Sequence, residues 1–425
     1  MVCLLAESRL AQAYIDPGTG SALFYVVTGI VVSVYFAVRG LYYRLLDLFF
    51  RIRHQHQRCT IAIHCEDARY EITFLPILRN LVARGLSPTF FTMYPRDEET
   101  FEALPAGVTH QPIAPGMVGY AYLNHVEATL LVTTTPQLDV MTFRRSRRVR
   151  HYAMVQHALG ESRFVRPYAY DHFDSVLCCG EILKHNIRRM ESLRASRPKE
   201  LLETGLPHYE ALLARRLEAP PLAGEPCVLV APSWGPLSMF EAYGTDFIAA
   251  IARRFRVIVR PHPQMKVSQA ALYAQILATP GVEVDTSRTP SEAMSRAHIL
   301  LSDISGIAHE FAFIYERPVV VIDRHLEPGG LEGEVLGGES ELKQRCAEFI
   351  VPVPGARIGE VADELARVLA SHSSERLRAV RDQLVYNFGH AGEVAATQLA
   401  EIFAREQSLA ATRATSRTAM APEAA

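Results

Sequence analysis

Short apolar runs alternate with helix-like segments along the chain from residue 59 onward. Strand-like runs separated by helices need crossover connections, and this spacing is typical of a parallel sheet with helices on both faces. The pattern therefore predicts two doubly wound α/β domains. The first set of runs lies at 59–65, 88–94, 128–134, 151–157 and 174–180, and the second at 227–233, 256–262, 282–285, 298–303 and 317–323.

A Pro-rich segment, "LEAPPLAGEP" at 217–226, separates the two sets and indicates a linker. We expect a first Rossmann-like domain over 59–216 and a second over 227–405. The two domains would face each other across a cleft, which is where ligands of such folds bind. The Ala/Ser/Thr-rich segment 406–425 has few residues that could enter a core and is expected to be a disordered tail.

Composition excludes several classes of function. The chain has 425 residues, of which 49% are hydrophobic and 21% charged, so it can bury ordinary cores. Its net charge of −2 supplies no basic field, which argues against nucleic acid as a partner. The seven cysteines form no C-x-x-C pair, which favours buried thiols in a reducing compartment.

An uncharged run of 18 residues, "SALFYVVTGIVVSVYFAV" at 21–38, precedes both domains. About 20 apolar residues cross a hydrocarbon core of ~30 Å. Five arginines follow between residues 39 and 58, whereas Arg9 is the one basic residue among the first 20, which places the C-terminal side in the cytoplasm. We expect residues 1–58 to anchor the chain on the cytoplasmic face of the plasma (inner) membrane through a helix at about 21–50, spanning or lying at the interface. A buried core helix is the alternative.

The stretch "VIVRPHPQM" at 257–265 ends a strand abruptly, because Pro261 and Pro263 lack amide donors. Arg260 and His262 are thereby placed beyond the carboxyl end of a strand, the edge at which open α/β sheets bind ligands. Such a pair could orient a pyrophosphate and neutralise leaving-group charge. The alternative for His262 is a structural histidine in a turn held by the two prolines.

A second candidate anion site follows the strand at 298–303. Asp303 begins a turn, Ser305 can cap the next helix, and Gly306 allows a ligand to approach the backbone closely. Helix amino ends carry unsatisfied N–H groups and partial positive charge, which suit a phosphate. The alternative is that Ser305 is only a helix cap.

His157 is the candidate general base, since it ends a strand of the first domain just before Gly160. A histidine can take a proton from an attacking hydroxyl at neutral pH. A structural role is the alternative, and His151 and His172 are weaker candidates.

The basic run "FRRSRRVRH" is either a solvated face or a patch for anionic lipid or a phosphate-bearing polymer. Its arginines are Arg144, Arg145, Arg147, Arg148 and Arg150. His54 and His56 lack further ligands at suitable spacing, so no metal site is predicted.

An ordered series of segments resembles the CDP-glycerol glycerophosphotransferases, the family of teichoic acid primases and polymerases. That family has a GT-B fold of two Rossmann-like domains, and its membrane-associated enzymes transfer glycerol phosphate from CDP-glycerol to a membrane-linked acceptor. The resemblance implies no metal and no other cofactor. It covers roughly residues 150–325, through "VQHALG" (155–160), "TGLPHYEAL" (204–212), "VLVAPSWG" (228–235), "VRPHP" (259–263) and "LSDISGIAHEFAFIYERPVVVID" (301–323).

Site residues follow from the resemblance position by position. His157 matches the histidine of the family's His-Gly-Thr motif and is the implied base. Arg260 and His262 match its Arg-x-His-Pro motif, which holds the donor pyrophosphate. Asp303 and Ser305 match the start of its Asp-Tyr-Ser-Ser segment.

The sequence departs from the family pattern at three places. These departures bear on the identity of the transferred group or of the acceptor more than on the binding of pyrophosphate. Ala158 and Leu159 replace Gly-Thr, Gly306 replaces the second serine, and Glu310 stands where the family usually has aspartate. Gly306 keeps its amide as a phosphate donor but lacks a hydroxyl.

The resemblance implies a transferase of bacterial cell-envelope biosynthesis, of the kind that makes teichoic acid or capsule. It would move glycerol phosphate, or a similar polyol phosphate, from a CDP-activated donor to a lipid-linked or polymer acceptor. One alternative is a GT-B glycosyltransferase that uses a nucleotide sugar. The other is a non-catalytic GT-B scaffold for envelope synthesis.

Overall fold

The structure is a computed structural model of the chain. It describes residues 17–53, 58–97, 101–141, 143–222, 224–287, 289–303, 305–323 and 330–419. The chain divides into two compact units, Met1–His56 and Gln57–Ala425.

The first unit contains one long helix, α1 (Pro17–Arg53). Its window Tyr25–Tyr42 has a mean hydropathy of 1.5, carries few charges and is not buried. By length and composition this helix could cross a membrane. Its exposure argues against the alternative of a buried core helix. His54 and His56 lie outside the described residues.

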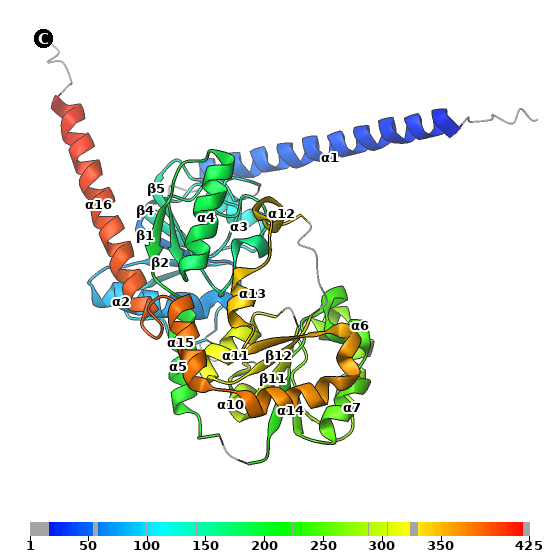
Figure 1. Ribbon diagram of the computed structural model, residues 1–425. Helices are drawn as coiled ribbons and strands as arrows, with labels where there is room; N and C mark the ends of the chain where they lie inside the picture. Colours follow the sequence, from blue (N-terminus) through cyan, green and yellow to red (C-terminus); the bar gives the residue numbers. More distant parts are fainter. Residues whose placement is uncertain are drawn as a thin grey trace, which may run out of the picture. The chain divides into compact units, whose positions relative to one another are not determined.

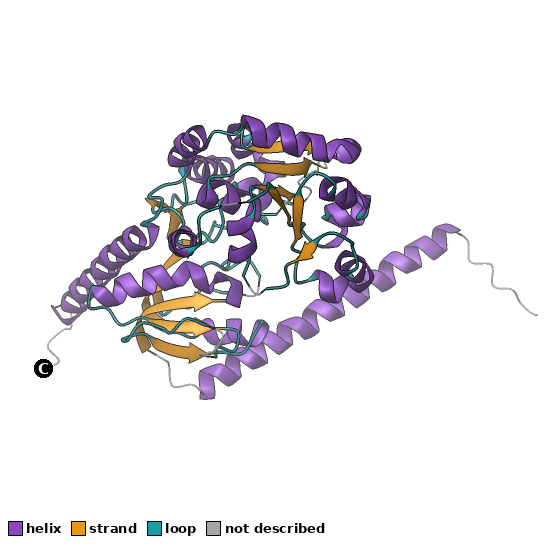
Figure 2. Cartoon of the chain, turned by 90° about the horizontal axis from the view of Figure 1, so that it is seen from below, coloured by secondary structure: helices purple, strands orange, loops and turns teal. Residues whose placement is uncertain are grey.

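The second unit contains two parallel sheets, as predicted (Figures 1 and 2). In the first sheet the strands are ordered β3-β2-β1-β4-β5-β6-β7, and in the second β10-β9-β8-β11-β12-β13. Every paired strand is parallel to its neighbour, so all carboxyl ends of one sheet lie at one edge.

The strands of the first sheet are β1 (Arg58–Cys65), β2 (Thr89–Thr92), β3 (Thr109–Pro112), β4 (Glu127–Thr133), β5 (Val149–Val155), β6 (Ser175–Cys178) and β7 (Glu200–Glu203). Those of the second are β8 (Cys227–Val230), β9 (Arg256–Val259), β10 (Glu283–Val284), β11 (Ile299–Ser302), β12 (Val319–Asp323) and β13 (Ile350–Pro354).

The helices of the second unit connect these strands. Those that precede β8 are α2 (Glu71–Ala83), α3 (Met117–Leu123), α4 (Glu181–Arg194) and α5 (Pro207–Glu218). Between β8 and β13 lie α6 (Met239–Tyr243), α7 (Asp246–Ala252), α8 (Met265–Ser268), α9 (Ala270–Leu277), α10 (Ser291–Arg296), α11 (Ile307–Tyr315), α12 (Gly333–Leu336) and α13 (Glu341–Cys346). After β13 follow α14 (Val361–Ser371), α15 (Ser374–Leu384) and α16 (Ala391–Ala419), and short 3₁₀ turns include η1 (Ala68–Tyr70), η2 (Ser162–Phe164), η3 (Gly235–Leu237) and η4 (Gly355–Glu360).

The last helix, α16, returns to the first sheet. Leu399 and Ile402 are buried in the same core cluster as Ile61 of β1 and Leu78 of α2, and α16 lies beside α2 in Figure 1. The predicted boundary of the second domain at residue 405 is therefore wrong, since residues 391–403 complete the first domain. The predicted disordered tail is also wrong as far as Ala419, because α16 continues to that residue.

Contacts at two places, among others, dock the second half of the chain onto the first. The first is made by the segment that contains α12, where the Glu332 carboxylate accepts a hydrogen bond of 2.7 Å from the Tyr168 amide and pairs with Arg194. The second is the turn between α15 and α16, where the Tyr386 amide donates to the carbonyl of Cys179 over 2.9 Å. Gly205, just before α5, lies against this turn. Its φ is +87°, and a Cβ on it would lie 2.0 Å from the Tyr386 carbonyl oxygen, so only glycine fits.

A Leu399→Ala substitution should lower the free energy of unfolding by roughly 2 to 5 kcal/mol, because it empties a fully buried site between α16 and the first sheet. Denaturant unfolding measures this loss. Glu401→Ala, at an exposed position of the same helix, serves as control and should change stability by less than about 0.5 kcal/mol. Equal effects of the two substitutions would contradict the packing of α16.

Candidate active site

Three groups of candidate residues lie just beyond strand ends. His157 follows β5 of the first sheet, Arg260 and His262 follow β9 of the second, and Asp303 follows β11. Their side chains differ in what they contact.

His157 is a half-buried, neutral imidazole. Burial, with a smaller effect of the Arg69 charge, lowers its pKa to about 4. Its ring centroid lies 4.2 Å from that of Tyr70, and its Nδ1 is buried without a hydrogen-bond partner among the described residues. An uncharged imidazole with an unused nitrogen can accept a proton.

His262 also keeps a lowered pKa, first through burial and then through the charges of Arg69 and Arg260. Its Nδ1 accepts a hydrogen bond of 3.2 Å from the Gln264 amide. In the neutral ring the proton is therefore assigned to Nε2, which can donate to a ligand. The Trp234 ring lies 6.0 Å away between centroids.

Arg69 links the two histidines, although sequence reasoning did not single it out. It belongs to η1, directly after β1, and its charge lowers the pKa of both His157 and His262. Its guanidinium carbon lies 5.6 Å from the centroid of the Tyr70 ring, and that ring packs against His157. Asp67 holds it through two side-chain hydrogen bonds of 3.0 Å, while 69% of the Arg69 side chain stays exposed. No motif marks such a residue, because it acts through its place after β1.

Arg260 is engaged within the protein. Its Nη1 donates to Asp285 Oδ2 over 2.5 Å and to Ser287 Oγ over 3.1 Å, and its Nη2 donates to the Ser287 carbonyl over 2.9 Å. The guanidinium therefore ties the end of β9 to the segment after β10. In this arrangement it supplies positive charge near His262 and is not presented for the bidentate grip on pyrophosphate that the resemblance implies.

Asp303 is buried and holds the loop that follows β8. Its Oδ1 accepts from the Ser233 amide over 2.8 Å, and its Oδ2 accepts from the Met239 amide over 2.9 Å. An ionised carboxylate only accepts hydrogen bonds and repels phosphate. We therefore revise the predicted phosphate contact of Asp303 to a positioning role.

Ser305 does not cap the helix that follows it, so that expectation is wrong. Gly306 is the N-cap of α11 and makes no side-chain cap bond, and the Ser305 carbonyl accepts from the Ala308 amide over 3.3 Å. A Cβ on Gly306 would meet nothing within 4 Å, and its φ of −60° suits any residue. The amino end of α11 is thus open on this side.

Glu310, in the first turn of α11, meets a histidine from the other half of the chain. Its Oε1 lies 3.7 Å from Nε2 of His208, the second residue of α5. Burial raises the pKa of Glu310 to about 7, and burial, with a smaller effect of His157, lowers that of His208 to about 3. Neither nitrogen of His208 has a hydrogen-bond partner among the described residues.

The Tyr209 hydroxyl adds another buried polar group without a described partner. Buried polar groups of this kind are uncommon, because each costs about 1 to 3 kcal/mol when left unpaired. Together with Nδ1 of His157 and the ring of His208, it forms a polar cluster next to the α11 start. The segment "TGLPHYEAL" contained two of these residues, but nothing in its pattern distinguished them from core residues.

Within the described ranges, no group of three or more His, Cys, Asp or Glu side chains is arranged to hold a metal ion. The arrangement instead offers a neutral base, an exposed guanidinium, an imidazole donor and a carboxyl group that titrates near neutral pH. These are the groups needed to deprotonate a hydroxyl and to stabilise charge on phosphate oxygens.

Comparisons with known proteins show the fold. No protein-family model and no curated protein matches the sequence. Among solved structures, the chain is similar to the wall teichoic acid polymerase TagF, with a TM-score of 0.57 and 12% identity over 93% of this chain and 100% of that one. It is also similar to a UDP-GlcNAc 2-epimerase from Neisseria meningitidis, with a TM-score of 0.52 and 11% identity over 82% of this chain and 100% of that one. The predicted GT-B fold is confirmed.

Glu310→Gln should change how stability depends on pH. The raised pKa means that the folded chain holds this proton up to about pH 7, whereas an unfolded chain releases it near 4.3. Ionisation of Glu310 therefore lowers the free energy of unfolding of the wild type as the pH rises between these two values. Relative to the wild type, the glutamine variant should gain roughly 1 to 3 kcal/mol from pH 4 to pH 8.

Urea unfolding at several pH values measures the difference, and Glu401→Gln, at an exposed position, is the control. A Glu310→Gln variant that tracks wild type across this range would show that the carboxyl ionises normally in the folded chain.

Proposed function

We propose that the chain is a membrane-associated transferase that moves glycerol phosphate, or a similar polyol phosphate, from a CDP-activated donor to a lipid-linked or polymer acceptor. The observation that carries this proposal is that one histidine, His157, lies just beyond the carboxyl end of β5 and another, His262, just beyond that of β9. Arg69 lies against the Tyr70 ring that packs on His157. Two imidazoles from different sheets and a guanidinium then act on one substrate.

The proposed chemistry begins at His157. One of its ring nitrogens takes the proton of an acceptor hydroxyl as that oxygen attacks the β-phosphorus of the donor. A new P–O bond forms, the bond between the two phosphates breaks, and CMP leaves with the electron pair. The proton on His157 then passes to solvent. No metal is required, because cationic and N–H groups of the chain stabilise the developing charge.

Charge stabilisation is assigned to groups from both halves of the chain. Arg69 and Nε2–H of His262 face the phosphates, and the amino end of α11, at Ser305 and Gly306, adds partial positive charge. Arg260 acts through its charge next to His262 and through the loop that it holds. Asp303 positions the loop after β8.

The proposed location is the cytoplasmic face of the membrane, with α1 as the anchor. Support comes from the apolar window Tyr25–Tyr42 and from the arginines that follow it. A lipid-linked acceptor would be presented to the enzyme at that surface, which fits an enzyme of bacterial cell-envelope synthesis.

A nucleotide-sugar glycosyltransferase is the second candidate. It is favoured by Ala158, Leu159 and Gly306, which depart from the motifs of the glycerophosphotransferases. In that case the hydroxyl would attack a sugar carbon and a nucleoside diphosphate would leave.

The released nucleotide distinguishes the two candidates. The full chain in neutral detergent, incubated with an acceptor extract and CDP-glycerol, CDP-ribitol, UDP-sugars or GDP-sugars, should release CMP from a CDP-polyol. His157→Ala and His262→Ala should each lower turnover at least ~10²-fold, and His185→Ala, on the exposed face of α4, should not. Release of UDP or GDP would establish the glycosyltransferase. If no donor is consumed and both alanine variants support polymer synthesis in cells, the chain is a scaffold.

Arg69→Gln tests whether one charge acts on both histidines. Removing a positive charge raises the pKa of His157, so the acidic limb of the pH profile of kcat/KM should move to higher pH. Arg253→Gln, an exposed position after α7, is the control. If the acidic limb of the pH profile does not move in Arg69→Gln, the charge of Arg69 does not act on the proposed base, His157.

A further inference from the structure

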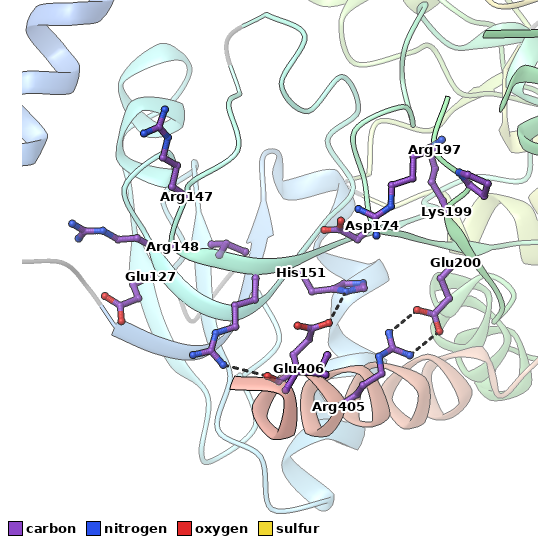
Figure 3. Close-up of a pocket in the computed structure, with 14 residues that line it drawn as sticks. Glu127, Arg147, Arg148, His151, Asp174, Arg197, Lys199, Glu200, Arg405 and Glu406 are labelled. Carbon is purple, nitrogen blue, oxygen red and sulfur yellow. Dashed lines mark hydrogen bonds and ion pairs between the residues drawn. The ribbon is translucent and has the colours of Figure 1, made fainter. Parts of the chain in front are cut away.

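A basic hollow opens at the opposite edge of the first sheet, where β4, β5, β6 and β7 begin (Figure 3). Its volume is about 930 Å³, and the second half of α16 forms one wall through Arg405, Glu406 and Leu409. Six basic side chains line it, Arg147, Arg148, Arg150, Arg197, Lys199 and Arg405, together with the carboxylates of Glu127, Asp174, Glu200 and Glu406.

Only part of this positive charge is neutralised. Arg405 pairs with Glu200 through contacts of 3.1 and 2.6 Å, and Lys199 pairs with Glu191 over 3.2 Å. The Asp174 carboxylate accepts from Arg145 over 2.7 Å and from the Tyr152 amide over 2.8 Å, so it is occupied as well.

Four arginines remain without a carboxylate partner in the part of the chain that the structure describes. They are Arg147, Arg148, Arg150 and Arg197, and all four are exposed. Arg150 donates only to the carbonyl of Glu406, over 3.2 Å. On a chain with a net charge of −2, such a concentration of free guanidinium groups favours an anionic ligand. Guanidinium groups match phosphate oxygens with two parallel N–H donors.

The hollow is separate from the candidate active site. β5 runs from Val149 beside the hollow to Val155, just before His157. At about 3.3 Å per residue the two places lie roughly 20 Å or more apart along this strand. A ligand in the hollow therefore does not contact the proposed base.

Chain connectivity associates this edge with the apolar helix. The chain passes from α1 to β1 through residues 54–57 only, and β1 begins at this edge, where Arg58 is in register with Glu127 of the hollow. Five peptide units span at most roughly 18 Å. Residues 43–53 of α1 add roughly 16 Å, so with the window Tyr25–Tyr42 in the bilayer the beginning of β1 would stay within roughly 35 Å of the membrane surface.

We propose that this basic hollow binds the phosphate groups of anionic phospholipids and so holds the first domain against the membrane by its strand-start edge. The proposal rests on the membrane location given under the proposed function, but it does not depend on the reaction. Each basic residue near an anionic surface strengthens attachment about fivefold. The opposite edge, with His157, is then left accessible to substrates.

A competition between vesicles tests the proposal with the full chain. Detergent-solubilised protein is mixed with equal amounts of phosphatidylcholine vesicles and denser vesicles that contain phosphatidylglycerol, the detergent is removed, and the two populations are separated. Because the apolar helix inserts into either population, the ratio reports the charge-dependent contribution. Arg147→Gln combined with Arg148→Gln should lower the preference for anionic vesicles about 10- to 30-fold.

The matched control is Arg253→Gln combined with Arg256→Gln, which removes the same charge from exposed positions near the start of β9. It should change the ratio less than about threefold. Equal ratios for the two double variants would overturn the proposal. Turnover in neutral detergent should be unaffected by the hollow variant, so failure of the proposed reaction is recognised separately.

Titration of the full chain in neutral detergent with inorganic polyphosphate addresses the other source of phosphate. A hollow variant that loses polyphosphate binding while it keeps its preference for anionic vesicles would assign the hollow to a soluble phosphate polymer and overturn the lipid proposal. At low salt, we expect the hollow variant to lose its preference for anionic vesicles. In the wild type, 0.5 M salt should abolish this preference.

Discussion

The charge of Arg69 and the two imidazoles that it reaches are the interaction on which this account depends. Parallel sheets place all their carboxyl ends at one edge, so a residue after β1 and a residue after β5 are brought to the same side of the first sheet. His262 comes from the second sheet, and burial, with a smaller effect of the same guanidinium, lowers the pKa of both histidines. Their neutrality is favourable for both proposed roles, since one ring must accept a proton and the other must donate a hydrogen bond.

The buried polar cluster has a cost and a possible use. Nδ1 of His157, the ring of His208 and the hydroxyl of Tyr209 have no hydrogen-bond partner within the described chain, and such groups destabilise a fold. Clusters of this kind with perturbed pKa values are common at functional sites. Because His208 precedes the linker and contacts Glu310 in the first turn of α11, the cluster also joins the two halves of the chain beside the proposed base. A ligand or a change in protonation at this place would act on both halves.

Central strands and the overall fold could be predicted from the sequence because strands that are buried on both faces are nearly continuous apolar runs. Three edge strands, β3, β7 and β13, were not predicted. β3 is polar, β7 begins and ends with glutamate, and β13 contains two prolines. The packing of α16 against the first sheet was not predicted for another reason. Its return to the first sheet depends on tertiary packing of Leu399 and Ile402, which a linear pattern does not reveal.

The candidate site could be predicted in position but less well in contacts. His157 and His262 lie at strand ends as expected, whereas Asp303 and Arg260 are engaged by protein groups and Ser305 is not a cap. Motifs identify which residues lie at a strand end, but hydrogen-bond partners such as Asp285 come from other strands and are not encoded nearby. Arg69 was overlooked, and Glu310 was noted only as a departure from the family pattern, because the relevance of both arises from neighbours that are distant in sequence.

An experimental structure of the full chain with CDP-glycerol bound would show whether the two histidines share one substrate. We expect the donor pyrophosphate to lie within hydrogen-bond distance of Nε2 of His262, with Arg69 facing it and a ring nitrogen of His157 on the side open to an acceptor. A nucleotide bound away from both histidines, or a His157 ring that cannot approach the β-phosphate, would contradict this expectation.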